Sequence, residues 1–135
     1  MRQDYAARAR VFVGTRFRAQ GRSARTGLDC AGLVIATFGI VDAEIRRNYR
    51  LRGDHRKELE TNLSRYFRSI DPSQLRSGDV LMMDVASDQQ HLAVWTIDGF
   101  VHADACLGLV VETPGLPKWT IVGAFRRRTR ALREA

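Results

Sequence analysis

The chain has 135 residues, of which 44% are hydrophobic and 27% charged, and its formal net charge is +7. This length supports one domain with a hydrophobic core, and no stretch approaches the roughly 20 consecutive apolar residues that span a bilayer. Charged residues stand among the first eight positions, so we expect no export through a secretory signal peptide. Two cysteines without a C-x-x-C spacing indicate neither a disulfide framework nor a zinc site.

The basic charge suits an anionic partner, such as nucleic acid, a wall polymer or an acidic protein surface. Arginines gather in a basic C-terminal tail that begins at about residue 126. No aromatic residues are interleaved with this tail, so nucleic-acid binding is not favoured. A solvated surface, or docking to an acidic protein surface, is the preferred interpretation.

Helices are predicted in the first half of the chain. Residues 2–12 carry apolar side chains at helical spacing, and Gly14 ends this segment. Residues 16–27 contain two glycines and little periodicity, which indicates a loop. A buried helix is predicted over residues 29–38, with Gly39 as its C-terminal stop.

The second half changes character. Residues 40–54 are interpreted as a surface connection with a partial helical turn, and residues 55–70 as an amphipathic helix. Short apolar runs follow, separated by turn signals, of which Asp98-Gly99 is a hairpin signal. Five strands are predicted, at residues 80–83, 91–97, 100–103, 107–112 and 120–125. Helices followed by an antiparallel meander indicate an α+β fold rather than a parallel sheet.

The stretch from Gly27 to Val34 is the strongest candidate for chemistry. Asp29 is a suitable helix N-cap, and Cys30 follows at the first helical position. There the positive end of the helix dipole favours an anion and lowers the pKa of a thiol. Cys30 is either an activated nucleophile or a small buried hydrophobe, and this stretch alone leaves both open.

A nucleophilic cysteine needs a base within reach and a group that orients the base. His55 lies among charged residues and is interpreted as a surface residue, whereas His91 opens one apolar strand and His102 closes the next. A helix-borne cysteine that faces such a pair is the arrangement of papain-like peptidases, in which the orienting residue fixes the tautomer of the base. Cys106 is interpreted as a packed thiol, and Trp119 as core or groove wall.

Four sequence blocks together resemble the NlpC-type cell-wall cysteine peptidases, which are compact papain-like hydrolases. The blocks are Asp29-Cys30-x-Gly32-Leu33-Val34, Leu75-Arg76-Ser77-Gly78-Asp79-Val80-Leu81, His91-x-Ala93-Val94-Trp95 and Phe100-Val101-His102-Ala103. They stand in the family's order and cover most of the chain. The resemblance implies one papain-like domain over residues 1–135, with N-terminal helices packed on a C-terminal antiparallel sheet of about five strands.

The resemblance also implies roles for individual residues. Cys30 would be the nucleophile, His91 the general base and His102 the residue that orients it. The backbone N–H of Cys30 would donate to the oxyanion. Family members hydrolyse an amide in peptidoglycan stem peptides, typically between D-glutamate and a diamino acid, and no metal or other cofactor is implied.

Asp29, Phe17 and Gln20 are implied to line the oxyanion or substrate side. The family often has a tyrosine where this chain has Phe17, and losing one such donor costs on the order of 2.7–4 kcal/mol of transition-state stabilisation. Gln20 or Ser23 is the candidate substitute. Asp29 matches a position that meets a substrate amine, although its capping role explains it equally well.

The hairpin sets a geometric condition for this site. A two-residue turn at residues 98–99 would place His102 opposite Trp95, with His91 about 13 Å further along the strand. We therefore expect the pairing to be centred nearer residues 96–97, or a bulge to shift the register, so that the two histidines meet.

Several functions remain open. The chain looks most like the short branch of the family that is encoded with phage tails and gene-transfer particles. The favoured hypothesis is a peptidoglycan endopeptidase or amidase, made in the cytoplasm and assembled with other tail proteins into a particle that opens the wall. The alternative is a structural tail-tip component with little activity. A nucleic-acid-binding module rests only on charge.

Overall fold

The structure is a computed structural model and describes residues 4–41, 56–86 and 89–128. Its helices are α1 (Tyr5–Val11), α2 (Cys30–Phe38), α4 (Arg56–Ser64) and the short 3-10 helix η1 (Pro72–Gln74). Its strands are β1 (Arg22–Ser23), β2 (Gly27–Leu28), β3 (Phe67–Ile70), β4 (Val80–Ala86), β5 (Gln89–Trp95), β6 (Gly99–Asp104), β7 (Leu109–Pro114) and β8 (Thr120–Arg127). The predictions for His55 and for nearly all of residues 40–54 lie outside the described residues.

The helix α2 coincides with the buried helix that the sequence predicts. The Asp29 carboxylate accepts the backbone N–H of Gly32 and caps the first turn. Gly39 ends the helix in the left-handed conformation, with φ of 67°, which a residue without a Cβ adopts at little cost. Eight of the nine residues of α2 are buried, so this helix is the centre of the core.

Strands β3 to β8 form a six-stranded sheet in the order β3-β8-β4-β5-β6-β7. All its neighbouring strands are antiparallel, and β4 to β7 form the predicted meander. The prediction is wrong for β8, which leaves the meander and pairs between β3 and β4. Its pairing covers the edge of β4, where unpaired backbone groups would otherwise be exposed.

The sixth strand arises from residues predicted to be helical. Helix α4 ends at Ser64, and Phe67 to Ile70 pair with β8 over four residue positions. Phe67 and Ile70 continue the helical spacing of Leu59 and Leu63, so the apolar pattern alone does not separate the two structures. Pairing with β8 decides for the strand, and Phe67 is fully buried there.

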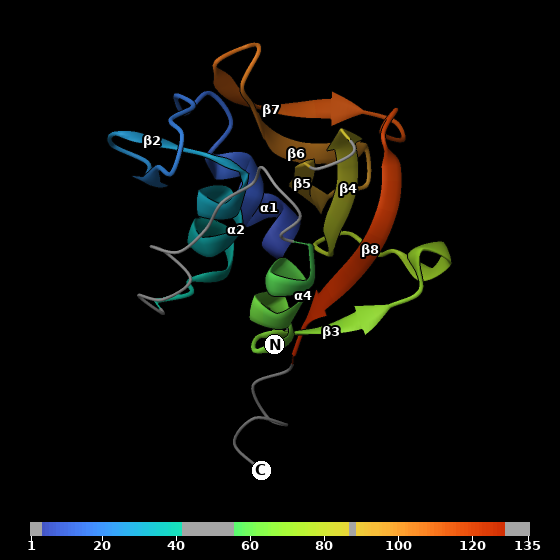
Figure 1. Cartoon of the computed structure of the whole chain (residues 1–135). Helices are drawn as coiled ribbons and strands as arrows, with labels where there is room; N and C mark the ends of the chain where they lie inside the picture. Colours follow the sequence, from blue (N-terminus) through green and yellow to red (C-terminus); the bar gives the residue numbers. More distant parts are fainter. Residues whose placement is uncertain (1–3, 42–55, 87–88, 129–135) are drawn as a thin grey trace.

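The three helices lie together on one side of the sheet (Figure 1). Their buried side chains share one core cluster with residues from β4, β5, β6, β7 and β8. Alternate residues of β4, β5, β6 and β8 form a second cluster: Leu81, Met83, Ala93, Phe100 and Ala124. Both sequence-adjacent methionines of β4 are therefore buried, Met82 in the first cluster and Met83 in the second. No helix in the described ranges is long and apolar enough to cross a membrane.

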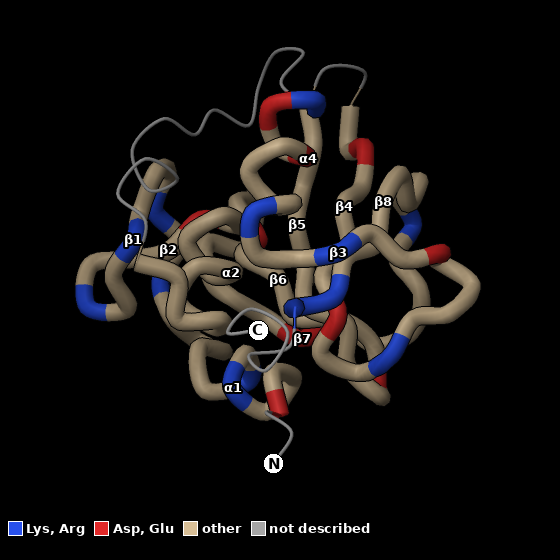
Figure 2. Tube along the Cα trace, turned by 90° about the horizontal axis from the view of Figure 1, so that it is seen from below, with Lys and Arg blue, Asp and Glu red and all other residues tan. Residues whose placement is uncertain are grey.

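The arginines at the start of the predicted basic tail are bound within the fold. Figure 2 shows basic positions close together on β3 and at the C-terminal end of the described chain. Arg126 binds the buried Asp79 carboxylate at 2.8 Å. Arg127 and Arg128 donate to the carbonyl oxygens of Tyr66 and Ser64, at 3.0 and 3.1 Å, after the last turn of α4. Arg127 and Arg128 thus tie β8 to the end of α4 and the segment before β3, whereas Arg126 ties β8 to the segment before β4.

Candidate active site

Cys30 stands at the start of α2 because Asp29 fixes that start. The Asp29 Oδ1 accepts the backbone N–H of Gly32 at 2.8 Å and Nη1 of Arg22 at 2.7 Å. Its Oδ2 accepts the backbone N–H of Gln20 at 2.9 Å. Asp29 is 2% exposed, so Arg22 supplies the charge that a buried carboxylate needs. The capping role is therefore present in the structure, and the substrate-amine role stays a prediction.

The close approach of the loop before β1 to this helix requires glycine. A Cβ on Gly32 would lie 2.1 Å from the Gly21 carbonyl oxygen, and a Cβ on Gly21 would lie 2.3 Å from the Gly27 carbonyl oxygen. Any side chain at Gly32 would push the loop away from the first turn of α2. These glycines therefore hold the loop against the helix beside the Cys30 thiol.

The Cys30 thiol is buried and neutral. Burial, followed by the charge of Asp29, raises the pKa of Cys30 to about 12, and the backbone N–H of Leu92 opposes this rise by donating to the sulfur. The prediction that the helix dipole lowers this pKa is wrong for the resting structure, because desolvation outweighs the dipole. Cys30 therefore rests as a thiol rather than as a thiolate.

The two histidines meet where β5 and β6 separate. Among the described residues, these strands pair at two positions, Val94 with Val101 and Trp95 with Phe100. This register places His102 opposite Ala93, two residues from His91, and the His91 Nε2 lies 2.9 Å from the His102 Nδ1. The register is thus displaced in the predicted direction, but by less than predicted, because its centre lies between Ile97 and Asp98 rather than at residues 96–97.

A buried threonine sets this register. The Oγ1 of Thr96 accepts the backbone N–H of Gly99 at 2.9 Å and that of Asp98 at 3.2 Å, and it donates to the Glu112 carboxylate at 2.7 Å. Arg10 of α1 binds Glu112 through two nitrogens, at 2.9 and 2.8 Å. The turn therefore spans residues 96–99 rather than closing at Asp98-Gly99 alone, in line with the expected displacement of the register. The Thr96 hydroxyl caps the turn that Thr96 begins, and this local bond competes with the preference of Asp-Gly for the two central positions of a hairpin turn.

The histidine pair is held neutral. Burial and the neighbouring His102 lower the pKa of His91 to about 4, while Asp104 opposes this change. Burial also lowers the pKa of His102, again against Asp104. The second ring nitrogen of His102, Nε2, lies 3.0 Å from the Thr113 Oγ1. A chain of hydrogen bonds thus runs from β5 through β6 to β7.

Trp119 forms a wall of this site, as one of its two predicted roles. Its ring meets the rings of His91 and His102 nearly at right angles, with centroids 5.5 and 5.9 Å apart. Sequence reasoning gave no role to Thr113. It lies on β7 opposite Phe100, and the pleat places it on the same face as His102. Only the strand register could have revealed it.

Phe17 and Gln20 lie in the loop before α2. Phe17 forms a parallel bridge with Leu28, packs against the core cluster and donates its backbone N–H to the Gly108 carbonyl. Its ring carries no hydrogen-bond donor. Gln20 has a positive φ of 59° and is exposed, and its backbone N–H is bound to Asp29. Oxyanion roles for both residues stay predictions.

The structure does not bring every pair of predicted catalytic residues into hydrogen-bonding contact. Cys30 and His91, both within the described residues, share no hydrogen bond, and the thiol instead meets the Leu92 N–H one residue away. Hydrogen bonds of this kind are often long in unliganded sites and tighten when substrate binds. Cys106 is exposed in the β6–β7 turn, so its prediction as a packed thiol is wrong. Its backbone N–H donates to Asp104 at 2.8 Å, which turns the chain outward.

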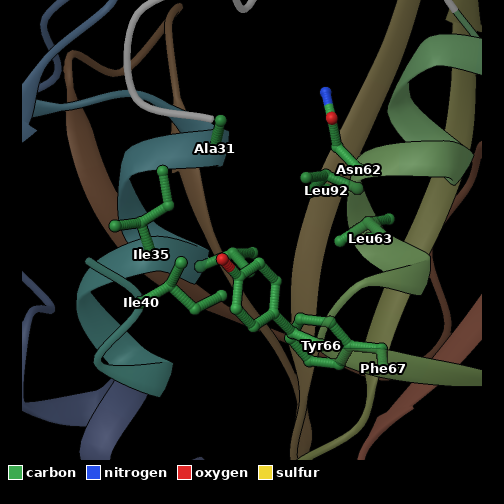
Figure 3. A pocket seen from close by; sticks show the side chains of 9 residues that line it. Ala31, Ile35, Ile40, Asn62, Leu63, Tyr66, Phe67 and Leu92 are labelled. Carbon is green, nitrogen blue, oxygen red and sulfur yellow. The ribbon is translucent and has the colours of Figure 1, made fainter. Parts of the chain in front are cut away.

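A small apolar cleft, open to solvent, lies between α2 and α4 (Figure 3). Its lining includes Ala31, Ile35, Leu63, Tyr66 and Leu92. Ala31 and Leu92 directly follow Cys30 and His91 in sequence, but neither histidine lines the cleft. In the described part of the chain, no three His, Cys, Asp or Glu side chains gather as metal ligands.

The chain is similar to known proteins over most of its length. The model of the NlpC/P60 family matches residues 14–120. Murein DD-endopeptidase MepS/murein LD-carboxypeptidase of Escherichia coli strain K12 is 27% identical over 107 residues, which are 78% of this chain and 51% of that protein. The chain thus spans about half the length of the curated relatives it matches.

Solved structures share the fold. An NlpC/P60 family protein from Bacillus cereus superposes with a TM-score of 0.61 and 21% identity, over 93% of this chain and 39% of that chain. The peptidoglycan hydrolase RipB of Mycobacterium tuberculosis gives a TM-score of 0.57 and 18% identity, over 92% and 62%. These neighbours confirm the predicted α+β, papain-like fold. Because the family model also covers Cys30, His91 and His102, the chain belongs to the NlpC/P60 family.

Proposed function

We propose that this chain is a peptidoglycan hydrolase, a cysteine peptidase that cleaves an amide in cell-wall stem peptides. The observations that carry the proposal are the contact of the Cys30 thiol with the backbone N–H of Leu92, one residue from His91, and the hydrogen bond between His91 and His102. The similarity to MepS and RipB, which are named for murein and peptidoglycan, supports the choice of substrate.

In the proposed reaction, His91 acts first as a base. It takes the proton of Cys30 as the sulfur attacks the substrate carbonyl, and His102 stabilises the imidazolium through the His91 Nε2. Backbone N–H groups of the first turn of α2 then donate to the oxyanion. Return of the proton to the leaving amine gives a thioester on Cys30, and attack by water releases the acid and restores the thiol.

Because Cys30 and His91 both rest neutral, the thiol proton must pass to His91 as the sulfur attacks the substrate. A thiol with a pKa of about 12 and an imidazole with a pKa of about 4 do not form an ion pair at neutral pH. Substrate binding that brings His91 into contact with the thiol changes this balance. We therefore expect Cys30 to react quickly with bound substrate and slowly with small alkylating reagents.

The bond cleaved and the route of delivery belong to the same proposal. The resemblance of the quoted motifs supports cleavage between D-glutamate and a diamino acid, and delivery with a phage-tail-like particle that contains other tail proteins. Detection of the chain in purified particles by mass spectrometry, at a constant ratio to tail proteins, tests the delivery. Absence of the chain from purified particles would refute the proposed delivery but not the proposed hydrolase activity.

A structural tail component is the second candidate. Two observations favour it: Cys30 is 1% exposed, and Phe17 carries no donor where the family often has tyrosine. This candidate keeps the fold and the histidine pair but predicts no turnover. The two candidates therefore differ in one measurable property.

The experiment compares two single-cysteine variants. Cys30→Ala removes the proposed nucleophile, whereas Cys106→Ala removes the exposed thiol and serves as a matched control. Each protein is incubated with isolated peptidoglycan of several stem chemistries, and the products are identified by mass spectrometry. Cleavage by the wild type and by Cys106→Ala, but not by Cys30→Ala, supports the hydrolase. No cleavage of any wall type favours the structural component.

A further inference from the structure

We propose that Thr113 is a positioning residue, whose hydroxyl accepts the His102 Nε2–H and so stabilises the tautomers of His102 and His91 that allow His91 to accept a proton from Cys30. The inference deepens the proposed function and rests on it for the roles of Cys30 and His91. The hydrogen-bond order itself is a property of the folded protein and is measurable without any substrate.

Both ring nitrogens of His102 have partners. Nδ1 lies 2.9 Å from the His91 Nε2, and Nε2 lies 3.0 Å from the Thr113 Oγ1. His102 is 2% exposed, so water does not replace either partner. A neutral imidazole carries one N–H and one lone pair, so one nitrogen of His102 donates and the other accepts.

The direction of these bonds decides whether His91 can act as a base. For its free nitrogen, Nδ1, to take the Cys30 proton, the His91 proton must sit on Nε2 and be donated to His102 Nδ1. His102 must then carry its own proton on Nε2 and donate it to Thr113. The reverse order places a proton on His91 Nδ1, where it blocks transfer from the thiol. The productive order therefore requires Thr113 to accept.

Among the described residues, no other side chain around the histidine pair accepts a hydrogen bond from His102 Nε2. The Asp104 charge acts on both rings, but its Oδ1 accepts the backbone N–H groups of Cys106 and Leu107. Trp119 and Phe100 contact the rings through their faces or edges and offer no acceptor. Among the described residues, Thr113 is the one side chain hydrogen-bonded to His102 Nε2.

The direct test is long-range 1H–15N NMR of the histidine rings in the unliganded protein. The variant His55→Gln leaves two ring systems, those of His91 and His102. We expect both to carry the proton on Nε2 at neutral pH. A proton on Nδ1 of either ring in the otherwise unchanged protein would overturn the proposal.

Variants at Thr113 extend the test. In the His55→Gln background, Thr113→Val removes the hydroxyl with little change of shape, and Thr113→Ser retains it. We expect Thr113→Val to move the ring proton onto Nδ1 of His91 and of His102 in the same NMR measurement, because it leaves a buried N–H of His102 unpaired in the productive order. Thr113→Ser should keep both protons on Nε2. Equal tautomers for valine and serine would contradict the proposal.

The readouts separate this inference from the proposed function. If peptidoglycan is cleaved, Thr113→Val should lower kcat about tenfold with KM unchanged, and serine should restore it. If no peptidoglycan is cleaved, the tautomers still decide the role of Thr113. Loss of cleavage in both variants, with wild-type tautomers, would show that Thr113 acts elsewhere.

Discussion

Acid should destabilise this fold through the histidine pair. Burial lowers the pKa of His91 from 6.5 to about 4, so between these values the unfolded chain binds a proton that the folded chain does not. The stability is complete above about pH 6.5 and falls as the pH approaches 4. The difference between the unfolded-state and folded-state pKa values of His91 corresponds to a maximum loss of about 3 kcal/mol in the free energy of unfolding. This is a large fraction of the roughly 5–15 kcal/mol that stabilises a domain. His102 shifts in the same direction and adds to the loss.

Urea unfolding at about pH 7 and about pH 4.5, followed by tryptophan fluorescence, measures this effect. The double variant His91→Gln/His102→Gln removes both titrating rings and keeps every carboxylate, so carboxylate titration cancels in the comparison. We expect the wild type to lose about 2–3 kcal/mol more than the variant between the two pH values. Equal losses would refute the assignment of buried, neutral histidines.

Three further predictions follow from the contacts around the site. Thr96→Val removes the hydroxyl that caps the β5–β6 turn and binds Glu112, and should cost about 2 kcal/mol in urea unfolding; a Thr96→Ser variant as unstable as valine would contradict this role. Arg22→Met leaves the buried Asp29 carboxylate without its ion pair and should cost about 3–5 kcal/mol. Adding Asp29→Asn should recover part of that loss, and no recovery would show that the charge is not the cause. With the second cysteine removed, iodoacetamide should alkylate Cys30 at a rate that rises steeply above about pH 8, since its pKa is raised to about 12; a plateau from pH 5 to 7 would reveal a resting thiolate.

Local signals in the sequence were sufficient for α2, but not for the short strands β1 and β2, which precede it in the segment predicted to be a loop. Asp29 as the cap, the apolar run and Gly39 as the stop act within one helix, and the structure contains all three. The meeting of His91 and His102 also followed from the sequence, but only through the family resemblance, which required a displaced register.

Long-range contacts account for the failures. Phe67 and Ile70 form β3 because β8 pairs with them, and their helical spacing concealed this. The turn at residues 96–99 depends on a hydroxyl that also binds Glu112 on β7. The raised pKa of Cys30 comes from burial under the completed fold, which a helix-dipole argument omits.

In the proposed reaction, Cys30 forms a thioester with a peptidoglycan stem peptide. Acid quenching of the wild-type protein during incubation with soluble muropeptides, followed by mass spectrometry of the Cys30-containing peptide, detects this intermediate. We predict an acyl adduct on Cys30 with the mass of a stem-peptide fragment, present in Cys106→Ala and absent in Cys30→Ala. Product formation without any adduct on Cys30, and unchanged in Cys30→Ala, would contradict it.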